Sequence, residues 1–135
     1  MIVLDASVWI SSLLTTDVNH VRSDDWLVRV STAGERFIVP SIFLPEVAGA
    51  FARRMGDKSA AAAALQRTLS SPAIAIAPID VSLATAAARL ALDLSLKGAD
   101  AAYIALAVER GSSLVTWDRE LITRAGTVAH VLEPT

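Results

Sequence analysis

Short apolar runs alternate with helical segments along the whole sequence, and this alternation restricts the possible fold more than any other feature. The apolar runs are rich in valine and isoleucine, which is typical of buried strands. Strands are expected at Ile2–Leu4, Phe37–Val39, Ala73–Ala77, Ser113–Thr116 and Val128–Leu132. Helices are expected at Val8–Leu14, Asp24–Val30, Pro45–Met55, Lys58–Leu69, Val81–Leu96, Asp100–Val108 and Asp118–Arg124. Such alternation predicts an α/β fold with one parallel sheet of about five strands and helices on both of its faces.

Composition agrees with one compact domain, which we expect to span residues 1–135. Hydrophobic residues make up 53% of the 135 residues, enough to bury a core, which excludes a disordered chain. Cysteine is absent, so disulfides and thiolate metal sites are excluded. The N-terminus has no basic segment before its apolar run, which argues against a signal peptide. No apolar stretch approaches the ~20 residues of a membrane span, and we expect a cytoplasmic protein.

Four carboxylates follow strands or open helices in this pattern. Asp5 ends the first apolar run, and Asp118 comes directly after the fourth. Glu46 follows Pro45, which suits the first turn of a helix, and Asp100 opens a later helix. Ligands of open parallel sheets bind at the carboxyl ends of the strands. We therefore expect all four acids at the same edge of the sheet.

Four converging carboxylates need a positive charge between them. Two unit charges ~4 Å apart repel by about 4 kcal/mol even at an effective dielectric of 20. A hard divalent cation with oxygen ligands, Mg²⁺ or Mn²⁺, is the natural occupant of such a site. No histidine lies near the four acids in the sequence, which disfavours zinc. Acid clusters of this kind serve phosphoryl chemistry, in which a metal activates water and stabilises the leaving oxygen.

Each acid also has a structural explanation that involves no ligand. Glu46 and Asp100 suit first helical turns, where a negative charge opposes the helix dipole for about 0.3–1 kcal/mol. Asp118 suits the N-cap position of the following helix. Asp5 is harder to explain in this way, because it ends a fully apolar run where an uncharged cap would suffice. Ser7 is expected to cap the first helix.

The net charge of −2, from 12 basic and 14 acidic residues, is unusual for a protein that binds nucleic acid. It argues against tight nonspecific DNA binding. If the four acids hold metal, however, the remaining 10 acids face 12 bases, and the rest of the surface is slightly basic. The net charge therefore does not exclude a nuclease.

Four segments together resemble a known family, in the expected order and over nearly the full length. They are Ile2-Val3-Leu4-Asp5-Ala6-Ser7-Val8, Val39–Val47 with its Pro45-Glu46, Gly98–Ala107 with Asp100 before an alanine-rich helix, and Leu114-Val115-Thr116-Trp117-Asp118. This set is similar to the PIN domain and, within it, to the VapC-type toxins of toxin–antitoxin pairs. Each segment alone is a weak signal, and the ordered set is a strong one.

The resemblance implies a PIN-like fold and a specific activity. It assigns Asp5, Glu46, Asp100 and Asp118 as the Mg²⁺ or Mn²⁺ ligands and catalytic residues. Ser7 and Thr116 would orient carboxylates or a metal-bound water from outside the ligand set. The family cleaves RNA by metal-activated water and leaves a 5′-phosphate and a 3′-hydroxyl. Members commonly form homodimers and are inhibited by a cognate antitoxin, so we expect both kinds of partner.

Three other interpretations fit parts of the same sequence. A receiver-type phospho-acceptor domain needs an acid pair after the first strand and a late lysine, but only Asp5 follows that strand and no lysine lies beyond Lys97. A PIN nuclease of RNA maturation without an antitoxin stays open, as does a PIN-like domain that binds RNA or a partner without cutting. The bare length favours the toxin modestly.

Further residues near the four acids have two readings each. Arg53 and Arg54 either contact RNA phosphates or oppose the dipole at a helix C-terminus, and the second reading is favoured. Trp117 either stacks on a base or fills space beside the core. Glu120 is expected to be a solvated surface residue.

Overall fold

The computed structural model describes all 135 residues and contains one five-stranded sheet. The strands are β1 (Ile2–Leu4), β2 (Phe37–Pro40), β3 (Ile74–Ala77), β4 (Leu114–Val115) and β5 (Val131–Leu132). Their order across the sheet is β3-β2-β1-β4-β5, and all four neighbouring pairs are parallel. The predicted α/β class and the parallel sheet of about five strands are confirmed.

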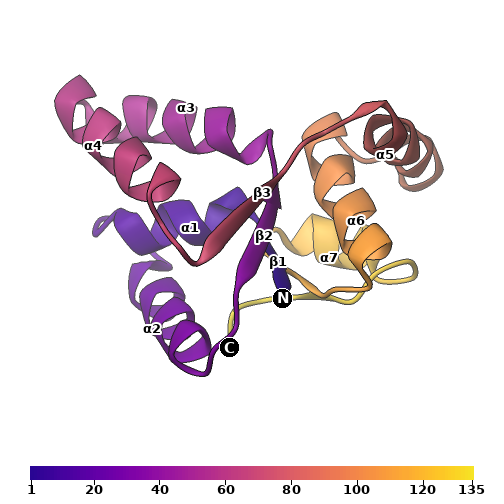
Figure 1. The fold of residues 1–135 in the computed structure, drawn as a ribbon, viewed down its shortest axis with the longest axis horizontal. Helices are drawn as coiled ribbons and strands as arrows, with labels where there is room; N and C mark the ends of the chain where they lie inside the picture. The colour runs from indigo at the N-terminus through magenta and orange to yellow at the C-terminus, as the bar shows by residue number, and fades with distance from the viewer.

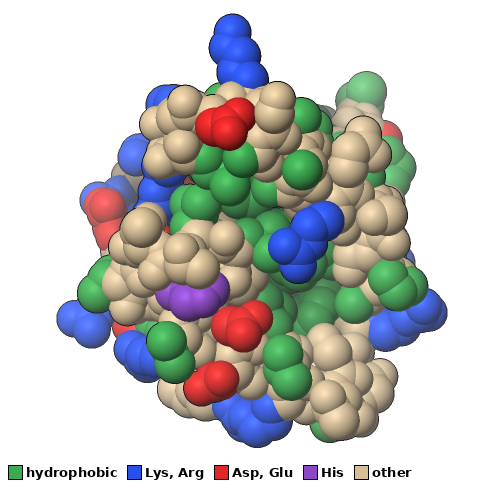
Figure 2. Space-filling view, turned by 90° about the vertical axis from the view of Figure 1, so that its left-hand side faces the viewer, with side chains coloured by type: hydrophobic (Ala, Val, Ile, Leu, Met, Phe, Trp, Pro, Cys, Tyr) green, Lys and Arg blue, Asp and Glu red, His purple; other side chains and the backbone are tan.

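Seven helices flank the sheet on its two faces. They are α1 (Ala6–Leu13), α2 (His20–Thr32), α3 (Phe43–Met55), α4 (Lys58–Leu69), α5 (Val81–Leu94), α6 (Gly98–Arg110) and α7 (Arg119–Ala125). Helices α1 to α4 lie on one side of the sheet and α5 to α7 on the other (Figure 1). On the outer face of the α1–α4 side, hydrophobic side chains gather in a central hollow (Figure 2). No helix combines the length and the apolar character needed to cross a membrane.

The centre of the molecule is formed by β1 and α6. Strand β1 pairs with β2 along one edge and with β4 along the other, and helices on both faces of the sheet (Figure 1) leave its Val3 and Leu4 side chains fully buried. Helix α6 buries seven consecutive residues, 101–107, four of which are alanine. Because alanine has a small side chain, α6 approaches the sheet closely, and α5 covers its outer side (Figure 1). Tyr103 of α6 is one of the largest fully buried side chains.

Some predicted boundaries are corrected by the structure. Helix α1 begins at Ala6 with Asp5 in the N-cap position, so the prediction that Ser7 caps this helix is wrong. The physical reason is that the Ser7 hydroxyl donates to the Asp5 carboxylate and accepts no bond from a helical N–H. Helix α2 begins at His20, earlier than expected. Helix α5 ends at Leu94 because Ser95 adopts a left-handed conformation, with φ of 53°.

The fold places the ends of the central strands at one edge. The chain leaves β1 at Asp5 to enter α1, and it leaves β4 through Thr116 and Trp117 to enter α7. Because β1 and β4 are parallel neighbours, Asp5 and Thr116 lie side by side at the carboxyl edge of the sheet. Helices α3 and α6 reach the same edge with their N-terminal turns, which carry Glu46 and Asp100.

Candidate active site

All four carboxylates singled out by the sequence line one open cleft at this edge. The cleft has a volume of about 510 Å³ and includes Asp5, Glu46, Asp100 and Asp118 among its lining residues. The four side chains come from the end of β1, from α3, from α6 and from the N-cap of α7. Residues separated by up to 113 positions are thus brought to one place by the parallel sheet.

Asp5 is the most enclosed of the four acids, with only 9% of the residue exposed. Its Oδ2 accepts hydrogen bonds from Ser7 Oγ at 2.5 Å and from Thr116 Oγ1 at 2.8 Å. Burial raises the pKa of Asp5 above its ordinary value, and the two hydroxyl donors oppose that rise. The two hydroxyls therefore fix the orientation of a carboxylate that burial alone would push toward its neutral form.

Thr116 connects two of the acids. Its hydroxyl donates to Asp5 and also accepts a bond of 3.0 Å from the backbone N–H of Asp118. Ser7 makes a similar link, because its hydroxyl accepts a bond of 3.2 Å from the backbone N–H of Trp117. The turn between β4 and α7 is therefore attached to Asp5 at two successive residues, and both hydroxyls expected to orient carboxylates contact Asp5.

Glu46 lies in the first turn of α3 and is held by a residue that the sequence reasoning missed. The hydroxyl of Tyr103 donates to Glu46 Oε2 at 2.6 Å. Burial raises the pKa of Glu46, the bond from Tyr103 opposes this rise, and repulsion by Asp5 and Asp100 adds to it. Burial and the nearby carboxylates also raise the pKa of the Tyr103 hydroxyl, so it remains a donor. A sequence signal existed, since Tyr103 lies one helical turn after Asp100.

Asp100 is half-buried in the first turn of α6 and accepts no hydrogen bond from another side chain. Burial raises its pKa first of all, and the negative charges of Asp5 and Asp118 raise it further. Lys97, three residues earlier, lowers this pKa. The carboxylate of Asp100 is thus exposed to the repulsion of its neighbours with no donor of its own.

Asp118 has two roles available to it. Its Oδ1 accepts from the backbone N–H groups of Glu120 at 2.9 Å and Leu121 at 3.1 Å, so it caps α7 as the structural explanation predicted. It also lines the acidic cleft. The cap uses one carboxylate oxygen, which leaves Oδ2 available to a ligand. Glu120 is exposed, as expected, and pairs with Arg124 at 2.5 Å.

The four acids have no cationic partner. None of the salt bridges in the molecule involves any of them. Asp5, Glu46 and Asp118 accept the hydrogen bonds already described, and no three acidic or histidine side chains lie close enough together to enclose a metal ion. The four carboxylates are therefore without salt-bridge partners, and every atom that they offer to a cation is an oxygen.

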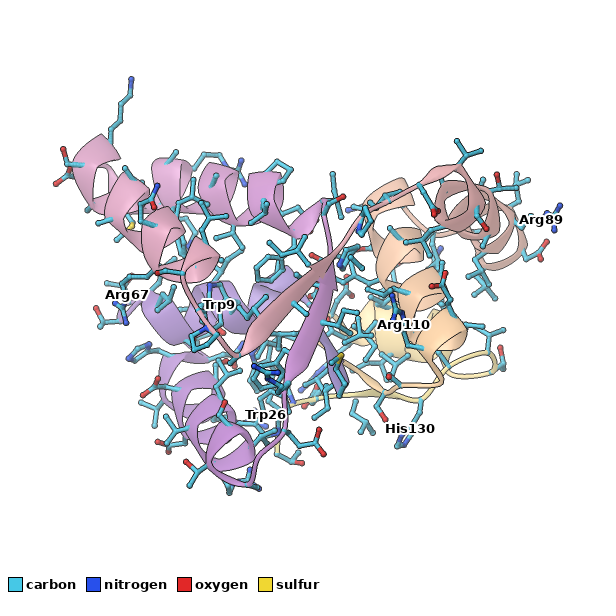
Figure 3. All side chains as sticks on the ribbon, viewed as in Figure 1. Trp9, Trp26, Arg67, Arg89, Arg110 and His130 are labelled. Atoms are coloured by element: carbon cyan, nitrogen blue, oxygen red, sulfur yellow. The ribbon has the colours of Figure 1, made fainter.

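Trp117, between Thr116 and Asp118, is anchored to the protein. Its Nε1–H donates to Ser23 Oγ at 2.8 Å, and the guanidinium of Arg22 lies 4.5 Å from the centre of its ring. Trp26 packs on Phe37 with ring centres 5.8 Å apart, and Trp9 donates to Thr68. Figure 3 shows Trp9 and Trp26 turned toward the inside of the molecule. These contacts agree with the interpretation of Trp117 as a residue that fills space beside the core.

Comparisons with solved structures identify the same fold in other proteins. VapC20 from Mycobacterium tuberculosis, described as a sarcin–ricin loop cleaving toxin, is 18% identical with a TM-score of 0.76 and covers 91% of this chain and 94% of its own. FitAcB from Neisseria gonorrhoeae is 22% identical with a TM-score of 0.76, and the match covers 99% of this chain and 98% of the FitAcB chain. A toxin–antitoxin complex from Klebsiella pneumoniae is 16% identical with a TM-score of 0.70, covering 100% and 98%.

A family model confirms what these structural likenesses and the sequence motifs indicate. A comparison with curated proteins found no match. The model of the PIN domain, in contrast, matches residues 2–126, which includes every strand but β5 and all four acids of the cleft. The chain belongs to the PIN domain family.

Proposed function

We propose that the protein is a divalent-metal-dependent endoribonuclease and the toxin of a type II toxin–antitoxin pair. The observation that supports this most directly is the cleft itself. Asp5, Glu46, Asp100 and Asp118 come from four separate elements to one open cavity, and three of them have raised pKa values. A fold that keeps mutually repelling carboxylates together at its surface is expected to use them on a cation.

The residues present suit Mg²⁺ or Mn²⁺. All the donor atoms are carboxylate or hydroxyl oxygens, which hard divalent cations prefer, and no salt bridge competes for the four acids. Asp5, Glu46, Asp100 and Asp118 would hold the metal. When bound, such a metal would lower the pKa of water and neutralise charge on a phosphodiester.

The remaining polar residues of the cleft would hold these acids in place. Ser7 and Thr116 direct two hydroxyls at one oxygen of Asp5, which leaves its other oxygen, Oδ1, without a side-chain donor. Tyr103 leaves Oε1 of Glu46 free in the same way. Thr116 also bonds the backbone of Asp118, so movement of one acid is coupled to the other. Groups that orient ligands from outside commonly affect affinity or activity 10–100-fold.

The RNA substrate and the antitoxin partner rest on the family and on relatives. VapC20 is described as cleaving the sarcin–ricin loop, and the Klebsiella protein as part of a toxin–antitoxin complex. The apolar hollow on the α1–α4 face offers a surface for a protein partner (Figure 2). We also include a homodimer and a cytoplasmic location in this proposal. A PIN nuclease of RNA maturation and a non-cleaving PIN-like domain are the alternatives.

The nuclease proposal is tested by incubating purified protein with RNA and either Mg²⁺ or Mn²⁺. We expect cleavage by the wild type, none after chelation, and a loss of at least about 100-fold in Asp5→Asn and Asp100→Asn. Asp93→Asn is the matched control, because it removes one exposed carboxylate of α5 outside the cleft. Equal cleavage by the wild type and both cleft variants would contradict the proposed site. Ends bearing a 5′-phosphate would agree with hydrolysis by water.

The toxin proposal needs a separate test in cells. Expression of the chain alone is expected to arrest growth, whereas Asp100→Asn is expected to be harmless. Co-expression of a short open reading frame adjacent to the gene should restore growth, and its product should co-purify with the protein. Normal growth with a nuclease that is active in vitro would favour the role in RNA maturation.

A further inference from the structure

Arg53 is the one basic side chain among the residues that line the four-acid cleft. It lies on α3, about two helical turns after Glu46. Its guanidinium folds back along the helix, so that Nη1 would be 3.1 Å from a Cβ atom placed on Gly49. The absence of a side chain at residue 49 therefore leaves room for Arg53 to reach toward the N-terminal turn of α3, where Glu46 lies.

Arg53 and its neighbour Arg54 have different surroundings in the structure, a difference that the sequence does not reveal. Arg54 forms an ion pair of 2.6 Å with Asp17. Arg53 makes no side-chain hydrogen bond and no salt bridge, although it is exposed beside four carboxylates. An unpaired guanidinium can bind an anion without first breaking an existing ion pair.

A second unpaired cation lies on the other side of the acids. Lys97, at the N-cap of α6, lines a smaller cavity of about 180 Å³ together with Asp100 and Asp118. Arg124 lines the same cavity but is occupied by Glu120 and by the carbonyl oxygen of Ser95. Lys97 makes no ion pair. Asp100 and Asp118 line both cavities, so these two acids separate Arg53 from Lys97.

An acidic cleft has a physical difficulty with a polyanionic substrate. Carboxylates that bind a metal at the scissile phosphate repel the phosphates on either side of it. Cationic side chains next to these neighbouring phosphates, which the metal does not contact, would offset this repulsion. Phosphate contacts of this kind position a nucleic acid without reading its sequence. The chain has a net charge of −2, so any such attraction must come from local placement of cations.

We propose that Arg53 and Lys97 bind backbone phosphates of the RNA on opposite sides of the scissile bond, so that the strand runs from the α3 side of the cleft to the α6 side. This inference rests on the proposed ribonuclease function. Both residues are substrate-binding groups, and neither is needed to hold the metal. The guanidinium of Arg53 offers paired N–H donors to a phosphate, whereas Lys97 acts as a point charge.

The test compares Arg53→Ala and Lys97→Ala with two control variants. Arg89→Ala removes an equal charge from α5 at a place that points away from the body of the molecule (Figure 3). Arg54→Ala removes the neighbouring guanidinium, which is paired with Asp17. RNA binding is measured by fluorescence anisotropy with a short, labelled single-stranded RNA. The buffer contains calcium chloride, and the salt concentration is varied between about 50 and 200 mM. Cleavage in Mg²⁺ gives KM and kcat for the same RNA, and a gel checks that the RNA stays intact in the binding assay.

Arg53→Ala and Lys97→Ala are each expected to weaken RNA binding about tenfold at the lower salt concentration. The plot of log affinity against log salt should become shallower by about 0.7, the value for one lost phosphate contact on a single strand. KM should rise with little change in kcat, and Arg53→Lys should recover part of the loss. The Arg89 and Arg54 variants should match the wild type.

Two results would contradict the proposal in different ways. In the first, the wild type cleaves RNA while the RNA affinity of Arg53→Ala and Lys97→Ala depends on salt as that of Arg89→Ala does. In that case the proposed phosphate contacts are wrong, and the proposed nuclease function is unaffected. If the wild type neither binds nor cleaves RNA, both the contacts and the proposed function are wrong.

Discussion

Tyr103 on α6 donates a hydrogen bond of 2.6 Å to Oε2 of Glu46 on α3, across 57 residues of sequence. The tyrosine is fully buried, whereas the glutamate opens into the acidic cleft. The bond therefore connects the core of the protein to one of its proposed ligands. It also supplies a donor to a carboxylate whose pKa is raised by burial.

Removal of this hydroxyl should destabilise the protein without creating a large cavity. Tyr103→Phe keeps the ring but leaves Glu46 Oε2 without its donor, so the free energy of unfolding should fall by about 1.5–3 kcal/mol. Urea denaturation at neutral pH measures this loss. Glu46→Gln keeps an acceptor oxygen and should keep most of the stability. An additive effect in the Tyr103→Phe, Glu46→Ala double variant, in which both partners of the bond are removed, would show that the two side chains do not interact.

Thr116 should matter through its hydroxyl and not through its shape. Thr116→Val preserves the volume of a fully buried residue but removes the donor to Asp5 and the acceptor for the Asp118 N–H. We expect a loss of about 1–3 kcal/mol in unfolding free energy, together with reduced cleavage. Thr116→Ser retains the hydroxyl and should retain activity. If valine proves as active as serine, the link between Asp5 and Asp118 has no functional role.

The two roles of Asp118 can be separated by two substitutions. Asp118→Asn keeps a side-chain oxygen for the N–H groups of Glu120 and Leu121, whereas Asp118→Ala removes the cap of α7. Alanine should cost about 1 kcal/mol of stability, and asparagine much less. Both variants lose the charge and should lose cleavage. Full activity in the asparagine variant would mean that Asp118 is only a helix cap.

Asp100 should make the metal-free protein less stable at neutral pH than at acid pH. Its pKa in the folded protein is raised above the ordinary value of 3.8. Folding therefore favours the protonated form of Asp100. The stability that this form contributes is present at pH values below the ordinary pKa, and it is lost as the pH rises through the raised pKa. Asp100→Asn should melt at a higher temperature than the wild type at pH 7 in chelator, and the difference should shrink toward pH ~4.

The same pair of proteins tests the metal without an activity assay. Mn²⁺ binds only the folded cluster in our proposal, so it should raise the melting temperature of the wild type. Asp100→Asn lacks one ligand and should gain less. Asp93→Asn, with its exposed site on α5, should respond as the wild type does. Equal shifts in all three proteins would contradict a metal site at Asp100.

Local sequence patterns are enough to predict the architecture and the approximate place of the four acids. Hydrophobic periodicity is a local property, and it reports strands and helices because each must bury one face. The alternation of these elements leaves a parallel sheet as the solution, and a parallel sheet brings the ends of β1 and β4 to one edge. For this reason Asp5 and Asp118 could be placed together from local patterns alone.

Which side chains contact one another could not be predicted from these local patterns. Three such contacts depend on the direction of side chains. They are the bond from Tyr103 to Glu46, the bond from Ser7 to Asp5, and the ion pair of Arg54 with Asp17, which Arg53 does not share. Neighbouring residues on a helix point about 100° apart, so adjacent arginines meet different surroundings that no local pattern describes. The physical reason is that contacts between distant segments are fixed by packing, whereas the sequence pattern reports only which residues are buried.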